Sequence, residues 1–269
     1  MTGNPLPENK YWDQVADSVE GYYLLPVLAR YKTREYLSLL QRWGLGNKGM
    51  VLYTDLYEAA LGDPGFFGEQ GNSPEIFGLD ISPGICRKSM ASLTEAGKNV
   101  RIVCSDARSL ACQDKTFELI VSPSTFDHFP DIGTPLRECY RVLKPGGRLV
   151  LALNSGCNPF FKLGVRLAER FKKKEYQTDY FYRAGQIRSL LTKAGFVAGR
   201  QTGIMHVPLG AVTVMEWLAR HNAPAWTERT FIRLFDLLGR LPRPWPLFTG
   251  WWVVIEGIKP GNLSGKDHQ

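Results

Sequence analysis

Hydrophobic side chains recur every three or four residues over the first part of the chain, which is the spacing of one helix face. This pattern runs through residues 11–43, where Pro26 either separates two helices or begins the second. Gly44, Gly46 and Gly49 then end the helical stretch. The residues that carry the pattern are Tyr22, Leu25, Leu28, Ala29, Tyr36, Leu37, Leu40 and Trp43.

From residue 50 onward, short apolar runs alternate with helical stretches, including helices predicted over residues 83–95, 133–143 and 186–194. Such alternation predicts βαβ units and a parallel sheet with helices on both faces. The fold class is therefore α/β, a Rossmann-like doubly wound and mostly parallel sheet. Strands are predicted over residues 50–53, 76–80, 100–104, 117–122, 148–153, 196–202 and 251–258.

Residues 209–246 fit no simple alternation, since they combine many large apolar side chains with a proline-rich end. We predict that they form a helical lid inserted before the last strand. The resulting division is an N-terminal helical cap (1–47), a Rossmann-like core (48–208 and 247–260), the lid (209–246) and a polar, flexible tail (261–269).

Composition narrows the classes of protein. No run approaches the ~20 apolar residues that span a bilayer, and the N-terminus does not resemble a secretory signal, so we expect a cytoplasmic protein. The five cysteines lack CxxC spacing, which argues against a disulfide framework and a zinc site, and no metal is expected.

The net charge of +7 allows an anionic partner. The one dense basic run, residues 170–174, is interpreted either as a solvated helix end or as a peripheral membrane contact. Aromatic and basic residues do not interleave along a strand as a nucleic-acid stacking surface requires, so no nucleic-acid partner is expected.

Ligands of open parallel sheets bind beyond the carboxyl ends of the strands, and two aspartates follow strands there. Asp80 ends the second predicted strand and can accept hydrogen bonds from both hydroxyls of a ribose; its alternative role is to cap the next helix, although Ser82 can do that alone. Asp106 follows the third strand and can accept from the amine of adenine, with a neighbouring backbone N–H serving a ring nitrogen. Its alternative role is an Asx turn.

Two further runs complete a recognisable order of motifs: residues 117–122 (FELIVS) and residues 141–149 (RVLKPGGRL). With the strand-Asp motifs, they resemble the class I S-adenosylmethionine-dependent methyltransferases, in particular the type 11 group. The resemblance covers about residues 48–200. It implies S-adenosyl-L-methionine as cofactor, held by residues that include Asp80, Ile81, Asp106, Ala107 and Ser122.

The first loop departs from that family, which usually has an acid followed by a glycine-rich turn after the first strand. Here the run is Val51-Leu52-Tyr53-Thr54-Asp55-Leu56-Tyr57-Glu58, so Tyr53 stands where the acid is expected and the glycines are replaced. We predict that Asp55 and Glu58 hold the ammonium group of the cofactor instead.

Candidate catalytic residues follow the fourth strand. The resemblance implies that His128 faces the methyl-transfer site, where it can act as a general base with Asp127 beside it; the alternative is that it only packs or caps a helix. His206, Trp217 and Trp226 are expected in a substrate pocket under the lid, although the lid aromatics can equally form the lid's own core.

The predicted function is methyl transfer to a small, aromatic or lipophilic acceptor. Two alternatives stay open: an inactive binding or scaffold protein of the same fold, and an enzyme of this fold that catalyses another reaction such as cyclisation.

Overall fold

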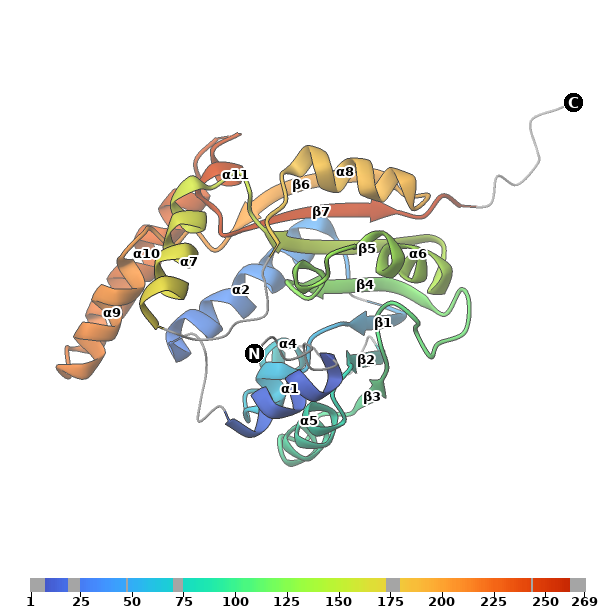
Figure 1. Cartoon of the computed structure of the whole chain (residues 1–269), viewed down its shortest axis with the longest axis horizontal. Helices are drawn as coiled ribbons and strands as arrows, with labels where there is room; N and C mark the ends of the chain where they lie inside the picture. The colour runs from blue at the N-terminus through green and yellow to red at the C-terminus, as the bar shows by residue number, and fades with distance from the viewer. Residues whose placement is uncertain are drawn as a thin grey trace, which may run out of the picture.

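The computed structural model describes residues 8–18, 25–46, 48–69, 75–172, 180–242 and 244–261. A seven-stranded sheet with the order β3-β2-β1-β4-β5-β7-β6 forms the centre of the molecule (Figure 1). Only β7 runs antiparallel to its neighbours, β5 and β6, so the predicted mostly parallel α/β fold is confirmed. The strands are β1 (Met50–Tyr53), β2 (Glu75–Asp80), β3 (Val100–Cys104), β4 (Phe117–Pro123), β5 (Leu143–Asn154), β6 (Val197–Ile204) and β7 (Trp252–Ile258).

Helices flank the sheet and connect its parallel strands. In chain order they are α1 (Glu8–Ser18), α2 (Pro26–Trp43), α3 (Tyr57–Ala60), α4 (Gly65–Glu69), α5 (Pro83–Glu95), the 3-10 turn η1 (Phe126–His128), α6 (Gly133–Val142), α7 (Pro159–Lys172), α8 (Ala184–Lys193), α9 (Ala211–Arg220), α10 (Ala225–Gly239) and α11 (Trp245–Thr249). Pro26 begins α2, as one of the two sequence interpretations has it, and Gly44 ends it with a left-handed φ of 65°.

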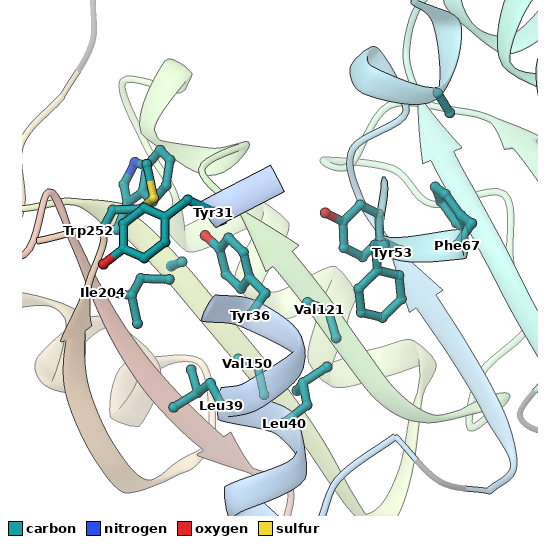
Figure 2. Packing of buried hydrophobic residues seen from close by; sticks show 14 of the residues in the cluster. Tyr31, Tyr36, Leu39, Leu40, Tyr53, Phe67, Val121, Val150, Ile204 and Trp252 are labelled. Carbon is teal, nitrogen blue, oxygen red and sulfur yellow. The ribbon is translucent and has the colours of Figure 1, made fainter. Parts of the chain in front are cut away.

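Alternate residues of the central strands point to two separate cores, one on each face of the sheet. Val51 and Tyr53 of β1 pack with α2, whereas Leu52 between them belongs to the opposite core with α6 and α8. Figure 2 shows the first core, where Tyr36 and Leu39 of α2 lie over the strands. Burial on both faces explains why these strands are continuously apolar in sequence.

One boundary of the prediction needed correction. The strand predicted over residues 148–153 begins earlier, at Leu143, so the run Lys144-Pro145-Gly146-Gly147 lies inside β5. An irregularity in the register between β4 and β5 accommodates it, and Gly146 adopts a φ of +80° there.

The loop after β1 is anchored by one packing contact. Leu56 is fully buried, and its side chain fills the space above Gly78 of β2. A Cβ atom placed on Gly78 would lie 2.5 Å from Leu56 Cδ2, so only glycine fits opposite this leucine. The hydroxyl of Ser89 on α5 donates to the Leu56 carbonyl at 2.9 Å and holds the loop from the other side.

We therefore predict that Gly78→Ala lowers the free energy of unfolding by about 1–3 kcal/mol, because the added methyl group has no space. Chemical denaturation measures this change. Gly185→Ala is the matched control, since a Cβ there meets no atom within 4 Å. Leu56→Ala should relieve the clash, so the double variant should lose less stability than the two single losses combined. Equal stability of wild type and Gly78→Ala would contradict the anchoring role of this contact.

Candidate active site

The strand order reverses between β1 and β4, and ligands of open α/β sheets bind beyond the carboxyl ends of the strands at such a point, a region that we call the crevice. Three hydroxyl groups meet at this point. Thr54 Oγ1 lies 3.0 Å from Ser122 Oγ and 3.1 Å from Thr125 Oγ1, and the Thr125 hydroxyl donates to the Thr54 carbonyl at 2.7 Å. The cluster ties the first loop to the end of β4. Of these three residues, only Ser122 was predicted from the sequence to belong to the site. The other two could have been predicted because hydroxyl residues follow two strands that are neighbours in the sheet.

Tyr53, at the position of the family's acid, is part of the hydrophobic core. Its ring stacks on Phe66 at 4.3 Å between centroids and meets Phe67 edge-on at 5.2 Å. Burial raises the pKa of the Tyr53 hydroxyl well above its usual value, so the side chain stays neutral. The aromatic cluster takes the place of the usual acid, and the anionic groups of the loop lie further along.

Asp55 lies at the carboxyl edge, where its Oδ1 accepts a hydrogen bond from the Tyr57 backbone N–H at 2.9 Å. Its charge acts on Asp80, the last residue of β2, which is the neighbouring strand. Burial is the main cause that raises the pKa of Asp80 to about 7, and repulsion from Asp55 adds to it. The backbone N–H groups of Ser82, Leu56 and Ile81 oppose this increase. The structure thus brings two predicted cofactor residues close enough for the charge of one to raise the pKa of the other.

The alternative capping role of Asp80 is taken by Ser82. Ser82 is the N-cap of α5, and its Oγ accepts from the Ile85 N–H at 3.0 Å. Asp80 Oδ1 accepts the Ser82 N–H at 2.9 Å and accepts no hydrogen bond from the first turn inside α5 among the bonds described. The carboxylate of Asp80 is therefore not part of the helix cap, as the sequence argument anticipated.

Glu58 has a different environment from the one predicted for an ammonium ligand. It is buried and forms an ion pair with Lys32 of α2, with 2.6 Å between Oε1 and Nζ. Burial raises the pKa of Glu58, and the Lys32 charge opposes that increase. Because the carboxylate already has a cationic partner, its ion pair joins α3 to α2. Asp55 is therefore better placed than Glu58 to bind the ammonium group of the cofactor.

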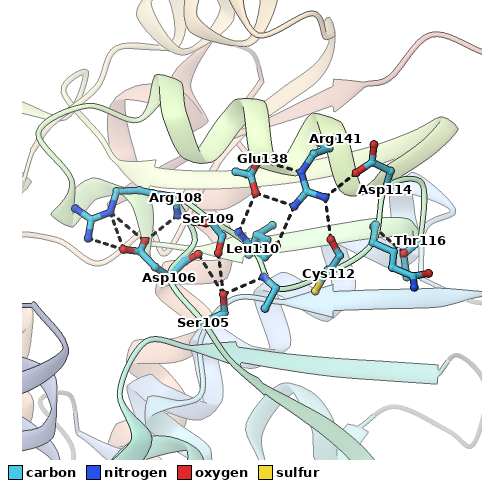
Figure 3. Close-up of polar contacts among 12 residues, drawn as sticks. Ser105, Asp106, Arg108, Ser109, Leu110, Cys112, Asp114, Thr116, Glu138 and Arg141 are labelled. Atoms are coloured by element: carbon cyan, nitrogen blue, oxygen red, sulfur yellow. Dashed lines mark hydrogen bonds and ion pairs between the residues drawn. The ribbon is translucent and has the colours of Figure 1, made fainter.

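Asp106 is engaged by Arg108, as Figure 3 shows. The guanidinium donates to both carboxylate oxygens, and the Arg108 backbone N–H donates to Oδ1 at 2.8 Å, which is the Asx turn named as the alternative. Burial raises the pKa of Asp106, but the hydrogen bonds and charge of Arg108 outweigh this and lower it overall. Ala107 beside it is buried. An adenine amine would have to share this carboxylate with Arg108.

The loop that carries Asp106 is fixed to α6 by Arg141. Its guanidinium donates to the Leu110 carbonyl at 2.9 Å and the Cys112 carbonyl at 2.8 Å, and it pairs with Glu138 and Asp114 (Figure 3). The Leu110 N–H in turn donates to Glu138 at 2.8 Å. These contacts give the loop after β3 a defined shape beside the crevice.

Asp127 and His128 lie on η1, directly after β4. Asp127 is fully buried, where its Oδ2 accepts from the Ser124 hydroxyl at 2.7 Å and the Asn154 N–H at 3.2 Å. These bonds join the ends of β4 and β5, so Asp127 holds the turn in place. His128 is half-buried, and its ring lies 5.2 Å from that of Trp12.

Helix α1 covers the crevice from outside, a contact that the sequence alone did not predict. Asp13 accepts hydrogen bonds from the Ser82 hydroxyl and from the Gly84 N–H, the latter at 2.9 Å. Lys88 of α5 donates to the Ala16 carbonyl at 2.6 Å. Trp12 reaches His128 from the same helix. The ends of β2 and β4 are thereby bridged by one helix.

The predicted substrate-pocket residues do not gather at one place. His206 is buried, its Nδ1 lies 2.8 Å from Thr249 Oγ1, and burial lowers its pKa to about 4. It borders an open groove of about 610 Å³ that lies between α2, β6 and α10. Trp217 and Trp226 are 57% and 61% exposed and are not among the residues that line this groove.

Comparison with known proteins finds similarity to methyltransferases. Residues 65–151 match the family model described as a methyltransferase domain. The chain is 33% identical over 146 residues to demethylmenaquinone methyltransferase of Lactococcus lactis, a match that covers 48% of this chain and 58% of the relative. It is 23% identical over 230 residues to the ubiquinone biosynthesis O-methyltransferase of Xanthomonas euvesicatoria, which covers 83% of this chain and 87% of that protein.

Solved structures share the fold at low sequence identity. A putative sarcosine dimethylglycine methyltransferase from Galdieria sulphuraria has a TM-score of 0.59 at 19% identity, and the match covers 94% of this chain and 98% of that chain. The cyclase SpnF has a TM-score of 0.60 at 16% identity, with coverage of 94% and 95%. Residues 65–151 therefore match a methyltransferase domain, and the chain shares its fold with these solved structures. The chain covers 58% of the length of the Lactococcus lactis relative and 34% of the length of a second demethylmenaquinone methyltransferase.

Proposed function

We propose that this chain binds S-adenosylmethionine in the crevice under α1 and transfers its methyl group to a small lipophilic acceptor. The observation that carries the proposal is the pair of carboxylates, Asp55 and Asp80, at the ends of adjacent strands. Repulsion from Asp55 adds to the effect of burial on Asp80, and a cationic ligand with hydroxyl donors relieves that repulsion. S-adenosylmethionine has both features, so these residues fit it.

When bound, this cofactor supplies an electrophilic methyl group on a positively charged sulfur. Asp80 would accept hydrogen bonds from the two ribose hydroxyls, and Asp55 would face the ammonium end. Thr54 and Ser122 fix the loop so that Asp55 keeps this position. Helix α1 would exclude water from the crevice, which strengthens each of these charge interactions.

His128 is the residue proposed to accept a proton from the acceptor, because it is half-buried after β4 and faces α1 through Trp12. Asp127 would support it by holding η1 to the end of β5 through Asn154. His206 is a weaker base, since burial lowers its pKa to about 4. Because His206 lies on the wall of the groove between α2, β6 and α10, we assign it no part in methyl transfer.

A lipophilic acceptor is supported by the relatives, which are named for menaquinone and ubiquinone, both lipophilic quinones. The rival functions make different demands. A scaffold protein would bind no cofactor, whereas an enzyme such as a cyclase would convert its substrate without gain of a methyl group. Calorimetry with S-adenosylmethionine and the mass of the product separate these cases.

We expect Asp55→Asn to weaken S-adenosylmethionine binding by roughly tenfold or more, because one charge-assisted contact to the ammonium group is lost. Glu58→Gln should have a smaller effect on affinity, since Glu58 faces Lys32. Calorimetry measures both. Adenosine, which lacks the ammonium group, is the control ligand and should bind Asp55→Asn nearly as well as wild type. Equal losses for both ligands would mean that Asp55 only supports the loop.

If His128 is the base, His128→Ala should lower the rate of methyl transfer by roughly 100-fold. The rate of methyl transfer by the wild type should also decrease below neutral pH as the imidazole becomes protonated, and the rate of the variant should not show this decrease. Steady-state assays with a quinol-type acceptor measure both. His221→Ala is the matched control, because His221 is exposed on the surface after α9. A variant that keeps most of its activity would leave positioning alone as the mechanism.

A further inference from the structure

Exposed apolar side chains of this protein are concentrated at one end. Among the described residues, fourteen large hydrophobic side chains are exposed, and twelve of these lie in residues 160–167 of α7 or in residues 209–248. We call these two segments the apolar end. Its exposed members are Phe160, Leu163, Leu167, Leu209, Val214, Trp217, Trp226, Leu234, Leu237, Leu241, Trp245 and Phe248.

The two segments of the apolar end lie together in space. Figure 1 shows α7, α9 and α10 grouped beyond one end of the sheet. Gly164 of α7 faces the Leu209 side chain, which would be 3.0 Å from a Cβ placed there. α7 follows β5, and α9 follows β6, so both leave the same carboxyl edge of the sheet that carries Asp55 and Asp80.

Among the described residues, the exposed charged side chains of the apolar end are all cationic. The exposed face of α10 presents Arg229 and Arg233 between Trp226 and Leu237 at helical spacing, and the exposed Arg240 caps the C-terminus of the helix. Arg166 is exposed next to Leu167 on α7, and Arg220 is exposed at the end of α9.

The carboxylates described in the same segments, by contrast, are withdrawn from the surface. Glu216, Glu228 and Asp236 are half-buried, whereas the arginines are exposed. Asp236 is moreover paired with Arg34 of α2. Among the side chains that the structure describes here, the exposed ones are therefore apolar or cationic, and the carboxylates are half-buried.

From this composition we propose that the apolar end docks on an anionic lipid bilayer. Leucine, phenylalanine and tryptophan side chains gain by leaving water for the interfacial region, where tryptophan is favoured. Arginines at the same surface are attracted to anionic headgroups. No helix in the described ranges is long and apolar enough to cross a bilayer, so the contact lies on the membrane surface.

A second copy of this chain is a less suitable occupant. A two-fold interface would bring the same surface patch against itself and so place Arg229 and Arg233 near their own copies. The bilayer instead supplies the opposite charge. The proposal does not depend on methyl transfer, because it rests on the surface alone, although the docked end would lie beside the edge where a lipophilic acceptor is expected.

Sedimentation with lipid vesicles tests the proposal. The wild-type chain should bind vesicles of phosphatidylcholine and phosphatidylglycerol in equal parts, and binding should weaken at high salt and on vesicles of phosphatidylcholine alone. Arg229→Gln combined with Arg233→Gln should lower the affinity for the anionic vesicles by roughly tenfold or more. Leu234→Gln combined with Leu237→Gln should lower it on both kinds of vesicle.

The matched control is Lys48→Gln combined with Lys193→Gln, which removes two exposed charges at the opposite edge of the sheet and should leave vesicle binding unchanged. Circular dichroism of each variant checks that it is folded. Equal loss in the control pair would show a general effect of net charge and overturn the assignment to this end. A wild-type chain that ignores anionic vesicles but forms a dimer broken by the leucine pair would show self-association instead. Neither outcome would bear on cofactor binding.

Discussion

The contact between Leu56 and Gly78 is the constraint on which the crevice depends. A leucine in the first loop is buried in a notch that exists because β2 has a glycine at that position. This contact draws the loop against β2, so that the Leu56 N–H faces Asp80 and Asp55 lies close enough to raise the pKa of Asp80. The family's glycine-rich loop lets a ligand approach the backbone; here the glycine is in the neighbouring strand and the loop has side chains instead.

In the proposed site, the negative charge of Asp55 lies two residues beyond the position of the family's usual first acid. Tyr53, at that position, belongs to an aromatic core with Phe66 and Phe67. Burial and repulsion from Asp55 raise the pKa of Asp80, and a bound cation would relieve the repulsion. Helix α1, held by Asp13 at the start of α5, shields the same region from solvent. The proposed site is thus formed from the first two strands and a helix that precedes both.

The fold was predictable because the strands are buried on both faces, which leaves short apolar runs such as residues 119–121, followed by the hydroxyl residue Ser122. Local features followed as well, including the Ser82 cap and the Asx turn of Asp106. Contacts between residues distant in sequence were not predictable. Lys32 forms an ion pair with Glu58, and Asp13 accepts a hydrogen bond from Ser82, about seventy residues further along the chain. Periodicity also could not show that Trp217 and Trp226 face solvent, because an exposed apolar face and a pocket wall have the same spacing.

The pH dependence of ligand binding tests the central claim most directly. Asp80 has a pKa of about 7 in the unliganded protein, whereas ribose hydroxyls and a nearby ammonium group favour its ionised form. Binding must therefore release a proton below that pKa, and the affinity should rise as the pH is increased from 6 to 8, by at most about tenfold per pH unit. Calorimetric titration of S-adenosylhomocysteine should show this increase for the wild type and a flat profile for Asp80→Asn. A flat wild-type profile, or the same slope in the variant, would contradict the account.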